Sequence, residues 1–529
     1  MSLKTLLLFQ YPITDNPKPQ LTMRSKISMN LKLTFSRLST VLAIVCSNYF
    51  LETSNAAAHA PAGYIVETLE IPEGVTLGVG GLAFAPDDAL FVTSREGQVW
   101  RLKDDEWNLF ADGLHEVLGI YIDPVTAEVW VMQRPELTKL IDEDGDGSAD
   151  VFRTVNADWG LTDNYHEYAF GIVRDSGGNF YGTLNTSLSW KGWAGSSKWD
   201  VGRVHDGKMG RATKYRGWSF QITPDGRFVP WSSGMRSPAG IGMNRHEEIF
   251  YTDNQGDWNG SSTLQHVVKG RFHGHPSSLM DHPDFQGKDL NAIPVETYDE
   301  LRTPPAVFFI HGDLANSPGE PVFNETGGQF GPFEDQVFVG DQSRSNLMRI
   351  YLEKVQGEYQ GAIFNFIDPM QTGIVRNQFD KNGVLYVGQT GRGWRSVGSE
   401  IFGLQTVRWD RRTTPVEMHS IRLTTTGFEI RFTQPMDETL LRDVNQFSIQ
   451  HWKYLYRPEY GSPKADKTKV TPANVTVSHD GMRVRFDVPL LTGRVYEFKA
   501  LGMKSKSGGD LTNPIGWYTL NHLRLNDTR

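Results

Sequence analysis

The short stretch DNYHEYAFG places a histidine, His166, among two acids and three aromatic residues, directly before a run typical of a β-strand. An imidazole changes charge near neutral pH, so His166 could be a general base that removes a proton from a bound substrate. Asp163 or Glu167 would then orient the ring. The alternative is a structural role, in which His166 hydrogen-bonds a loop and packs between Tyr165 and Tyr168. The stretch is compatible with both roles.

The acidic segment IDEDGDGSAD is a second group of residues that could bind a ligand. Asp142, Asp144 and Asp146 stand at every second position, and Asp150 closes the loop. Carboxylates at alternate positions, followed by a glycine at a sharp turn, form the first half of an EF-hand-like loop and predict a calcium site. Position twelve is Arg153 instead of glutamate, so another segment would have to complete the coordination. The alternative is a solvated acidic turn, although four close carboxylates repel one another without a cation.

Three histidines lie close together in GRFHGHPSSLMDHPDF. His273 and His275 are two residues apart and would share one face of an extended strand, and His282 could join them as a third nitrogen ligand for a metal. Segments rich in Gly, Pro and His also occur as ordinary turns, so metal binding is one of two interpretations here.

These residues need elements that bring them together, and the pattern between Pro61 and about Asp410 predicts which ones. An apolar strand, a turn with Asp, Gly or Pro, and an aromatic-rich strand recur about six times, as in GGLAFAPDDALFVTSREGQVWRL and GIVRNQFDKNGVLYVGQTG. Such repeats are typical of propeller blades, each of which buries its faces against its neighbours. We predict a six-bladed β-propeller over residues 61–412. The segment GWSFQITPDGRFVPWSSGMRSP should supply outer strands of the third blade; as a separate blade it would make seven.

The pattern of polar and apolar residues changes after RWDRRTTP. Polar and apolar residues alternate in VEMHSIRLTTTGFEIRFTQPMD, VTVSHDGMRVRFDVP and RVYEFKALGM, each bounded by turn residues. This pattern predicts an immunoglobulin-like β-sandwich over residues 413–529. The expected fold class of the whole chain is therefore all-β.

The N-terminal residues 1–60 carry an export pattern, with basic residues, a short apolar run and a small-x-small site at Ala58-His59-Ala60. We expect the true start at Met23 or Met29 and a mature, exported protein, periplasmic or extracellular, that begins near Pro61. The apolar run is too short to span a bilayer, so no transmembrane helix is expected in the mature chain.

Charge and cysteine content exclude several functions. The chain of 529 residues has a formal charge of −9 and no long basic run, so it lacks the electrostatic footprint of a nucleic-acid-binding protein. Its only cysteine, Cys46, lies in the predicted signal segment. The mature chain would therefore have no disulfide, no thiolate metal site and no attachment site for a c-type haem.

Three motifs carry a resemblance to a known family. SSGMRSPAGIGM, FYTDNQGDWNG and KGRFHGHP resemble motifs of the glucose/sorbosone dehydrogenase family, and the likeness spans much of residues 75–409. RPELTKLIDEDGDGSAD and YHEYAFGI are more closely similar to a group of secreted dehydrogenase-like propellers that are often fused to cytochrome c modules. Characterised quinoprotein members of the larger family oxidise sugars with pyrroloquinoline quinone (PQQ).

The resemblance implies roles for individual residues. His166 would abstract the proton of the sugar hydroxyl, and Arg236 would contact the quinone. Asp253, Asn254 and Asp257 would lie around a quinone-bound calcium.

Two positions depart from the family pattern. Ser237 stands where the family has asparagine, and Arg344 is the nearest counterpart of the lysine that the family places over the quinone. An arginine cannot be assumed to replace that lysine, because the two cations differ in geometry.

Two classes of function follow. The first is an exported quinone-dependent oxidoreductase that acts on a sugar or related alcohol and passes electrons to a separate acceptor. The second is a non-catalytic propeller that binds a carbohydrate or a partner, with Trp190, Trp193 and Trp199 as sugar-stacking residues. A calcium-dependent lactone hydrolase is a third interpretation, but the sequence lacks a convincing set of central ligands for it.

Overall fold

The computed structural model describes residues 59–189, 201–391, 396–398 and 400–525. All of them belong to one compact unit that begins at Asn55. The export segment up to Ala58 and the tryptophans Trp190, Trp193 and Trp199 lie outside the described residues, so the expectations for them remain predictions.

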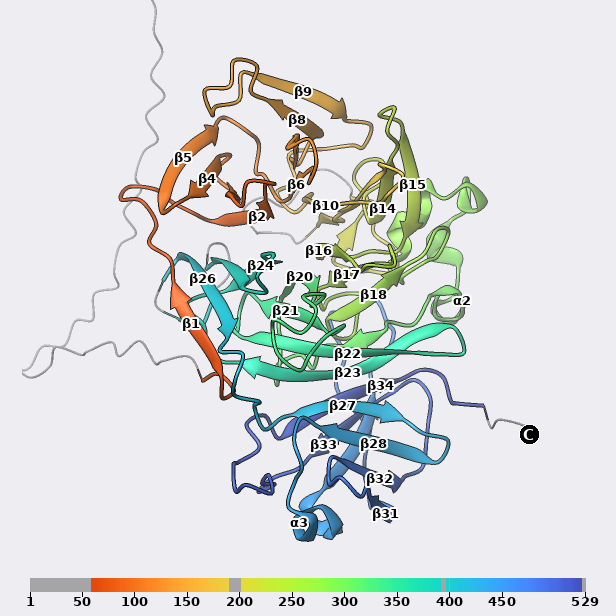
Figure 1. The fold of residues 1–529 in the computed structure, drawn as a ribbon. Coiled ribbons are helices and arrows are strands. Elements are labelled where there is room, and N and C mark those ends of the chain that lie inside the picture. The colour runs from red at the N-terminus through yellow and green to blue at the C-terminus, as the bar shows by residue number, and fades with distance from the viewer. Residues whose placement is uncertain (1–58, 190–200, 392–395, 399, 526–529) are drawn as a thin grey trace, which may run out of the picture. The chain divides into compact units, whose positions relative to one another are not determined.

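Strands β1 to β26 form six four-stranded antiparallel blades, with β12 (Ser187–Leu188) and β13 (Met209–Gly210) as a small separate sheet (Figure 1). The first three blades are β2 (Val79–Phe84), β3 (Leu90–Ser94), β4 (Val99–Lys103) and β5 (Glu106–Ala111); β6 (Ile120–Ile122), β7 (Val129–Met132), β8 (Leu137–Ile141) and β9 (Val151–Asn156); and β10 (Ala169–Arg174), β11 (Phe180–Leu184), β14 (Trp218–Ile222) and β15 (Phe228–Ser233).

The other three blades complete the set. They are β16 (Pro238–Met243), β17 (Ile249–Asp253), β18 (Thr263–Val267) and β19 (Val307–Phe308); β20 (Pro318–Phe323), β21 (Val337–Asp341), β22 (Leu347–Val355) and β23 (Glu358–Ile367); and β24 (Ile374–Phe379), β25 (Leu385–Thr390) and β26 (Phe402–Trp409) with β1 (Tyr64–Thr68).

The blades close into a ring. Their first strands, β2, β6, β10, β16, β20 and β24, contact one another in this order, and β24 also contacts β2. The N-terminal strand β1 completes the last blade, because it pairs with β26 from Tyr64↔Trp409 to Thr68↔Gln405. The predicted all-β propeller with six blades is therefore confirmed. Residues 217–238 contribute β14 and β15 to the third blade and do not form a seventh.

The core of the propeller lies between blades, as expected for sheets that bury both faces. Phe91 of β3 clusters with Val131 of β7, and Val79 of β2 clusters with Leu404 of β26 across the closing seam. All five residues of β3 are buried. Each large apolar side chain buried in this way stabilises the fold by about 1.5–3 kcal/mol. Because many such contacts hold each blade against its neighbours, the ends of the inner strands have fixed positions.

The C-terminal strands form two layers of four strands around an apolar core that also includes Val355, Ala362 and Phe364 of the fifth blade. The first is β27 (Met418–Leu423), β28 (Gly427–Phe432), β32 (Arg483–Asp487) and β31 (Ala473–Val477). The second is β34 (Ile515–Leu520), β33 (Arg494–Lys499), β29 (Ser448–Lys453) and β30 (Ala465–Val470). The immunoglobulin-like assignment of residues 413–529 stays a prediction. Strands β26 and β27 lie on either side of the expected boundary after residue 412.

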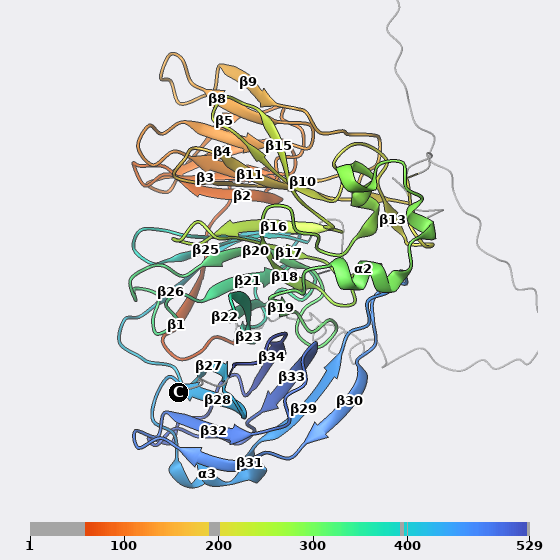
Figure 2. The same cartoon turned by 90° about the vertical axis from the view of Figure 1, so that its right-hand side faces the viewer.

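The sandwich continues the fifth blade. Strand β34 pairs with β23 from Gly361↔Thr519 to Phe364↔Gly516, so one sheet of eight strands runs through both parts. Figure 2 shows β23 and β34 side by side. Sequence patterns indicated two domains, but they could not show that the two share a sheet.

A buried arginine reinforces this junction. Arg349 of β22 is fully buried and donates hydrogen bonds to the carbonyl oxygens of Met418 (2.6 Å) and His419 (3.0 Å) at the start of the sandwich. Its guanidinium carbon lies 4.1 Å from the ring centroid of Phe333. Glu417 is 4.0 Å away, and burial raises the pKa of this carboxyl to about 8.

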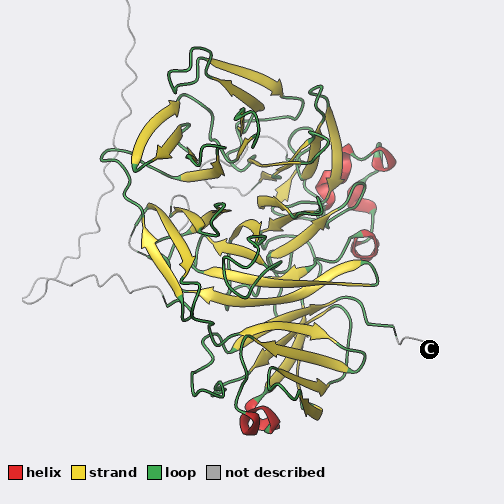
Figure 3. Ribbon diagram, viewed as in Figure 1, coloured by secondary structure: helices red, strands yellow, loops and turns green. Residues whose placement is uncertain are grey.

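Helices are short and few in the part of the chain that the structure describes (Figure 3). The connection from β18 to β19 carries η1 (Pro276–Asp281), η2 (Pro283–Phe285), η3 (Leu290–Ala292) and α2 (Val295–Leu301). The connection from β28 to β29 carries α3 (Glu438–Arg442) and η4 (Val444–Gln446). Within the described ranges, no helix is long and apolar enough to cross a membrane.

Candidate functional site

A cavity of about 340 Å³ lies where the inner strands of the blades converge. Its lining includes three arginines, Arg95, Arg236 and Arg376, from the first, third-to-fourth and sixth blades. None of its described lining residues is an aspartate or a glutamate. The cavity wall therefore presents cationic and neutral groups, a lining that suits an anionic ligand or one rich in hydrogen-bond acceptors.

His166 lines this cavity from the loop that precedes β10. Its Nδ1 atom is 2.9 Å from the carbonyl oxygen of Thr186, and its Nε2 atom is 3.3 Å from Oγ of Ser237. A carbonyl oxygen only accepts, so the proton of a neutral ring resides on Nδ1 and leaves Nε2 as the acceptor. The geometry therefore provides a basic nitrogen at the cavity wall.

The electrostatics of His166 differ from the sequence-based expectation. Burial, with a contribution from Arg236, lowers the pKa of His166 to about 4, so the ring is neutral at neutral pH. Neither expected acid orients the ring: Glu167 is buried and accepts hydrogen bonds from Thr162 and Ser187 instead. Asp163, three residues before His166, is exposed.

The structural role expected as the alternative is also present. The His166 ring lies 5.9 Å from that of Tyr165 and 5.8 Å from that of Tyr168, measured between centroids. His166 thus packs against aromatic rings and faces the cavity at the same time, and its contacts by themselves fit either role.

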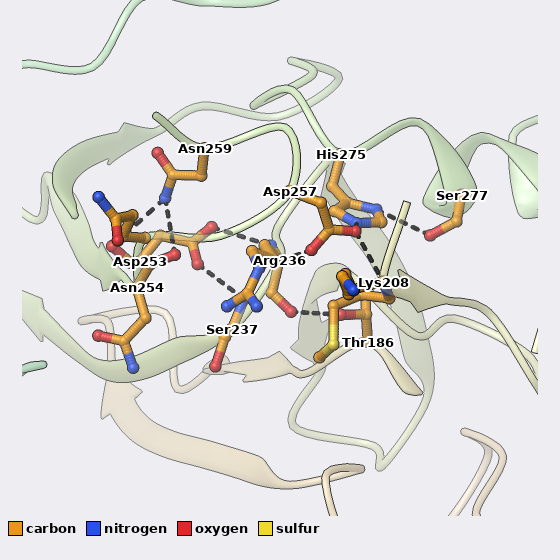
Figure 4. Close-up of polar contacts among 12 residues, drawn as sticks. Thr186, Lys208, Arg236, Ser237, Asp253, Asn254, Asp257, Asn259, His275 and Ser277 are labelled. Carbon is orange, nitrogen blue, oxygen red and sulfur yellow. Dashed lines mark hydrogen bonds and ion pairs between the residues drawn. The ribbon is translucent and has the colours of Figure 1, made fainter. Parts of the chain in front are cut away.

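Behind the cavity wall lies a buried charge network (Figure 4). Nε of Arg236 donates to Oδ1 of Asp257 at 3.0 Å, and Oδ2 of Asp257 accepts from the backbone N–H of Met209 and lies 3.2 Å from Nε2 of His275. These partners hold the pKa of Asp257 well below its usual range, despite complete burial. Arg236 is thereby fixed with its guanidinium against the cavity.

Asp253 has a different task. Its two carboxylate oxygens accept the backbone N–H groups of Arg236 (2.9 Å) and Ser237 (2.7 Å), and burial raises its pKa to about 6. Asp253 and Asp257 therefore shape the segment that carries Arg236, and neither of them lines the cavity.

This arrangement bears on the expected quinone site. The carboxylates of Asp253 and Asp257 are both hydrogen-bonded inside the protein, so this donor set does not fit a quinone-bound calcium. Asn254 does line the cavity, and its Oδ1 is buried without a hydrogen-bond partner. Nε of Arg95 and Oδ1 of Asn185 are also buried without a hydrogen-bond partner. The guanidinium N–H groups of the cavity arginines fit the carboxylates of PQQ. The amide oxygens of Asn185 and Asn254 are acceptors and suit a hydroxyl or N–H donor of a ligand instead.

Arg344 lies apart from the cavity. Its Nη1 donates to the carbonyl oxygen of Gly312 at 2.7 Å, and the residue lines a smaller pocket together with Asp313 and Trp517. The cavity is lined instead by its neighbours Gln342 and Ser343. The position matched to the family's lysine by sequence therefore points elsewhere.

Sequence reasoning missed two cavity arginines. Arg376 of β24 is 2% exposed, and Nε and Nη1 donate to the carbonyl oxygens of Gly80 and Ala239 on other blades. Arg95 pairs with Glu116 at 2.6 Å and lies over the ring of Tyr168. No motif marks either residue, because their common location arises only when blades distant in sequence meet at the centre.

The acidic loop joins β8 to β9, away from the cavity. Asp142, Asp144 and Asp146 bring ligand oxygens within 4.8 Å of one another. Asp150 instead accepts the backbone N–H of Glu143 at 2.7 Å. Asp142, Asp144 and Asp146 also accept backbone N–H groups of their own loop. The calcium site of this loop therefore stays a prediction.

The three-histidine metal site is not formed. Among the described residues, only Asp142, Asp144 and Asp146 group as a candidate metal cluster. His275 is bound to Asp257, His282 stacks on Trp218, and His273 is buried beside Tyr251. The strand expected to align these rings is absent, because the chain turns into η1 directly after His275.

Comparison with known proteins gives one family match. Residues 63–309 match a family described only as a domain of unknown function, DUF7133. No curated protein matches.

The similar solved structures are propeller enzymes at low identity. The PQQ-bound aldose sugar dehydrogenase from Streptomyces coelicolor is 16% identical with a TM-score of 0.43, over 66% of this chain and 99% of that one. The PQQ domain of pyranose dehydrogenase from Coprinopsis cinerea is 11% identical with a TM-score of 0.47, over 66% and 97%. A luciferin-regenerating enzyme is 11% identical with a TM-score of 0.44, over 65% and 95%. Such distant similarity concerns the fold alone, and the activities named differ.

Proposed function

We propose that the chain is an exported oxidoreductase of the quinone-dependent type, which oxidises a sugar or related alcohol in the central cavity. The observation that carries this proposal is that the His166 imidazole, whose Nε2 lies 3.3 Å from Oγ of Ser237, lines a cavity with three arginines and no described carboxylate. A base beside a binding site for an anionic or acceptor-rich molecule is what such an oxidation needs.

In this proposal each residue has a defined task. Nε2 of His166 accepts the proton of the substrate hydroxyl, while the bond from Nδ1 to the Thr186 carbonyl keeps the ring in the required tautomer. Arg236, held by Asp257, and Arg95, held by Glu116, bind acidic groups of the ligand. Bound PQQ would supply the acceptor for the hydride that leaves the substrate carbon.

The test is reconstitution of the mature protein with PQQ and calcium, followed by turnover of aldoses and polyols with an artificial electron acceptor. We expect quinone binding by absorbance titration and, in His166→Ala, a loss of about 10² to 10⁴ in turnover with binding retained. His246→Ala is the control, because His246 is exposed on the turn between β16 and β17. Absence of quinone binding would contradict the proposal.

The second candidate is a non-catalytic propeller that binds a carbohydrate or another small ligand. The observation in its favour is the low basicity of His166, together with the internal hydrogen bonds of Asp253 and Asp257 that remove the expected calcium ligands. Saturable sugar binding without turnover in the same assay would select this function.

A further inference from the structure

The β29–β30 loop of the C-terminal sandwich, residues 454–464, reaches the propeller beside the central cavity. Three backbone hydrogen bonds attach it to the segment between β17 and β18. The N–H of Gly461 donates to the carbonyl oxygen of Gly256, and the N–H of Ser462 donates to that of Gly260, both at 2.9 Å. In the opposite direction, the N–H of Trp258 donates to the carbonyl oxygen of Arg457 at 2.9 Å. The propeller segment is the one that carries Asp257.

Glycines on both sides permit this close approach. A Cβ on Gly260 would lie 2.9 Å from Cβ of Ser462 and 3.0 Å from the carbonyl oxygen of Leu455. Gly461 has φ +69°, and a Cβ there would lie 2.9 Å from Cδ of Gln255. The two surfaces therefore meet at a distance that larger residues would prevent.

Tyr456 adds a side-chain anchor. Its hydroxyl donates to the carbonyl oxygen of Gly274, and its ring lies 5.3 Å from that of Trp258. The guanidinium carbon of Arg302 lies 4.8 Å from the centroid of the Tyr456 ring. The loop is thus held by backbone and side-chain contacts on the propeller side.

This anchored loop places Tyr460 at the cavity. Tyr460 is 53% exposed, lines the cavity, and has its ring centroid 5.3 Å from the guanidinium carbon of Arg236. Arg236 itself is only 6% exposed. A large aromatic ring with much free surface therefore lies beside the arginine that the proposed function assigns to ligand binding.

We propose that the sandwich is part of the ligand site: its β29–β30 loop forms one wall of the cavity, and Tyr460 controls access to Arg236 and contacts the ligand through its ring. The ligand contact rests on the proposed function, whereas the covering of Arg236 does not. The ring suits a planar or sugar-like ligand, since aromatic faces stack on both and hold the adjacent guanidinium by a cation–π contact.

The test compares Tyr460→Ala with Tyr460→Phe and with Leu501→Ala, a change at an exposed apolar residue of the same sandwich. The first readout is the rate at which phenylglyoxal modifies Arg236, followed by peptide mass spectrometry. The second is the affinity for PQQ, measured by absorbance titration. Melting temperature verifies that each variant is folded.

We expect Tyr460→Ala to accelerate modification of Arg236 and to weaken PQQ binding roughly 5- to 30-fold, the worth of a partly desolvated cation–π and stacking contact. Tyr460→Phe and Leu501→Ala should match the wild type in both readouts. An unchanged modification rate in folded Tyr460→Ala would overturn the proposal and leave the loop as a docking contact only. A wild type that fails to bind PQQ, with Arg236 still uncovered by Tyr460→Ala, would refute the proposed function but not the covering role.

Discussion

His166 illustrates how the environment of one residue determines its chemistry. Histidine usually titrates near pH 6.5, but burial beside Arg236 lowers the pKa of His166 to about 4. A lowered pKa means that the neutral, proton-accepting form persists to more acidic pH. The ring is therefore ready to act as a base over the whole neutral range, although its basicity is weak.

The first prediction concerns this pH dependence. If His166 is the base, kcat/KM for the reconstituted enzyme should stay level from neutral pH down to about pH 5 and fall below it, with an apparent pKa near 4. The measurement is a pH profile with buffers of constant ionic strength. An acid limb centred between pH 6 and 7 would mean that another group titrates.

The second prediction concerns Arg236. Removing this cation in Arg236→Ala leaves the fully buried carboxylate of Asp257 without its guanidinium partner. Loss of one member of a buried pair costs about 3–5 kcal/mol, so this variant should unfold at markedly lower denaturant concentration and also lose ligand affinity. Chemical denaturation is the measurement, and stability equal to the wild type would contradict the role of the pair.

At the scale of elements, the loop between β8 and β9 tests the calcium prediction. Ligand oxygens of Asp142, Asp144 and Asp146 lie within 4.8 Å of one another there. Calcium should raise the melting temperature and a chelator should lower it, because binding to the folded state alone stabilises by about 2.7 kcal/mol at a hundredfold excess over Kd. Asp144→Asn should abolish the response, and a wild-type melting curve indifferent to calcium would refute the site.

The contact between β22 and β27 depends on Arg349. Its guanidinium is fully buried and supplies hydrogen bonds to Met418 and His419. We expect Arg349→Ala to destabilise the protein by about 3–5 kcal/mol, since buried acceptors lose their donor and a cavity is left. Arg408→Ala is the matched control: Arg408 forms an exposed pair with Glu67, and such pairs contribute about 0–1 kcal/mol. Similar losses in both variants, measured by urea denaturation, would contradict this assignment.

At the scale of the whole molecule, propeller and sandwich share the sheet through β23 and β34 and the apolar cluster that contains Trp452 and Phe309. We therefore expect one cooperative unfolding transition for the mature protein, with equal calorimetric and van't Hoff enthalpies. Two separate transitions would indicate independent domains. A chain that ends at residue 412 should aggregate, because it exposes the long edge strand β23 and this cluster.

The sequence by itself determined the all-β class and the six blades, whereas the boundary of the C-terminal sandwich after residue 412 stays a prediction. Period-two alternation and turn residues such as those in GNFYGTLNTS are local signals, and local backbone preference with one buried face is enough to set a strand. His166, Arg236 and Asn254 were named from sequence as candidate site residues, since their short motifs resemble a family, and all three line the cavity.

The tertiary structure alone decided which of these side chains share a site. Arg376 and Arg95 meet Arg236 because blades far apart in sequence converge, and Tyr460 arrives from the sandwich through the β29–β30 loop. Asp253 and Asp257, which the resemblance placed around a quinone-bound calcium, have their oxygens used by backbone N–H groups, Arg236 and His275. Sequence motifs indicate which chemical groups are present. Only packing fixes which buried group satisfies which partner, because every buried charge must find one.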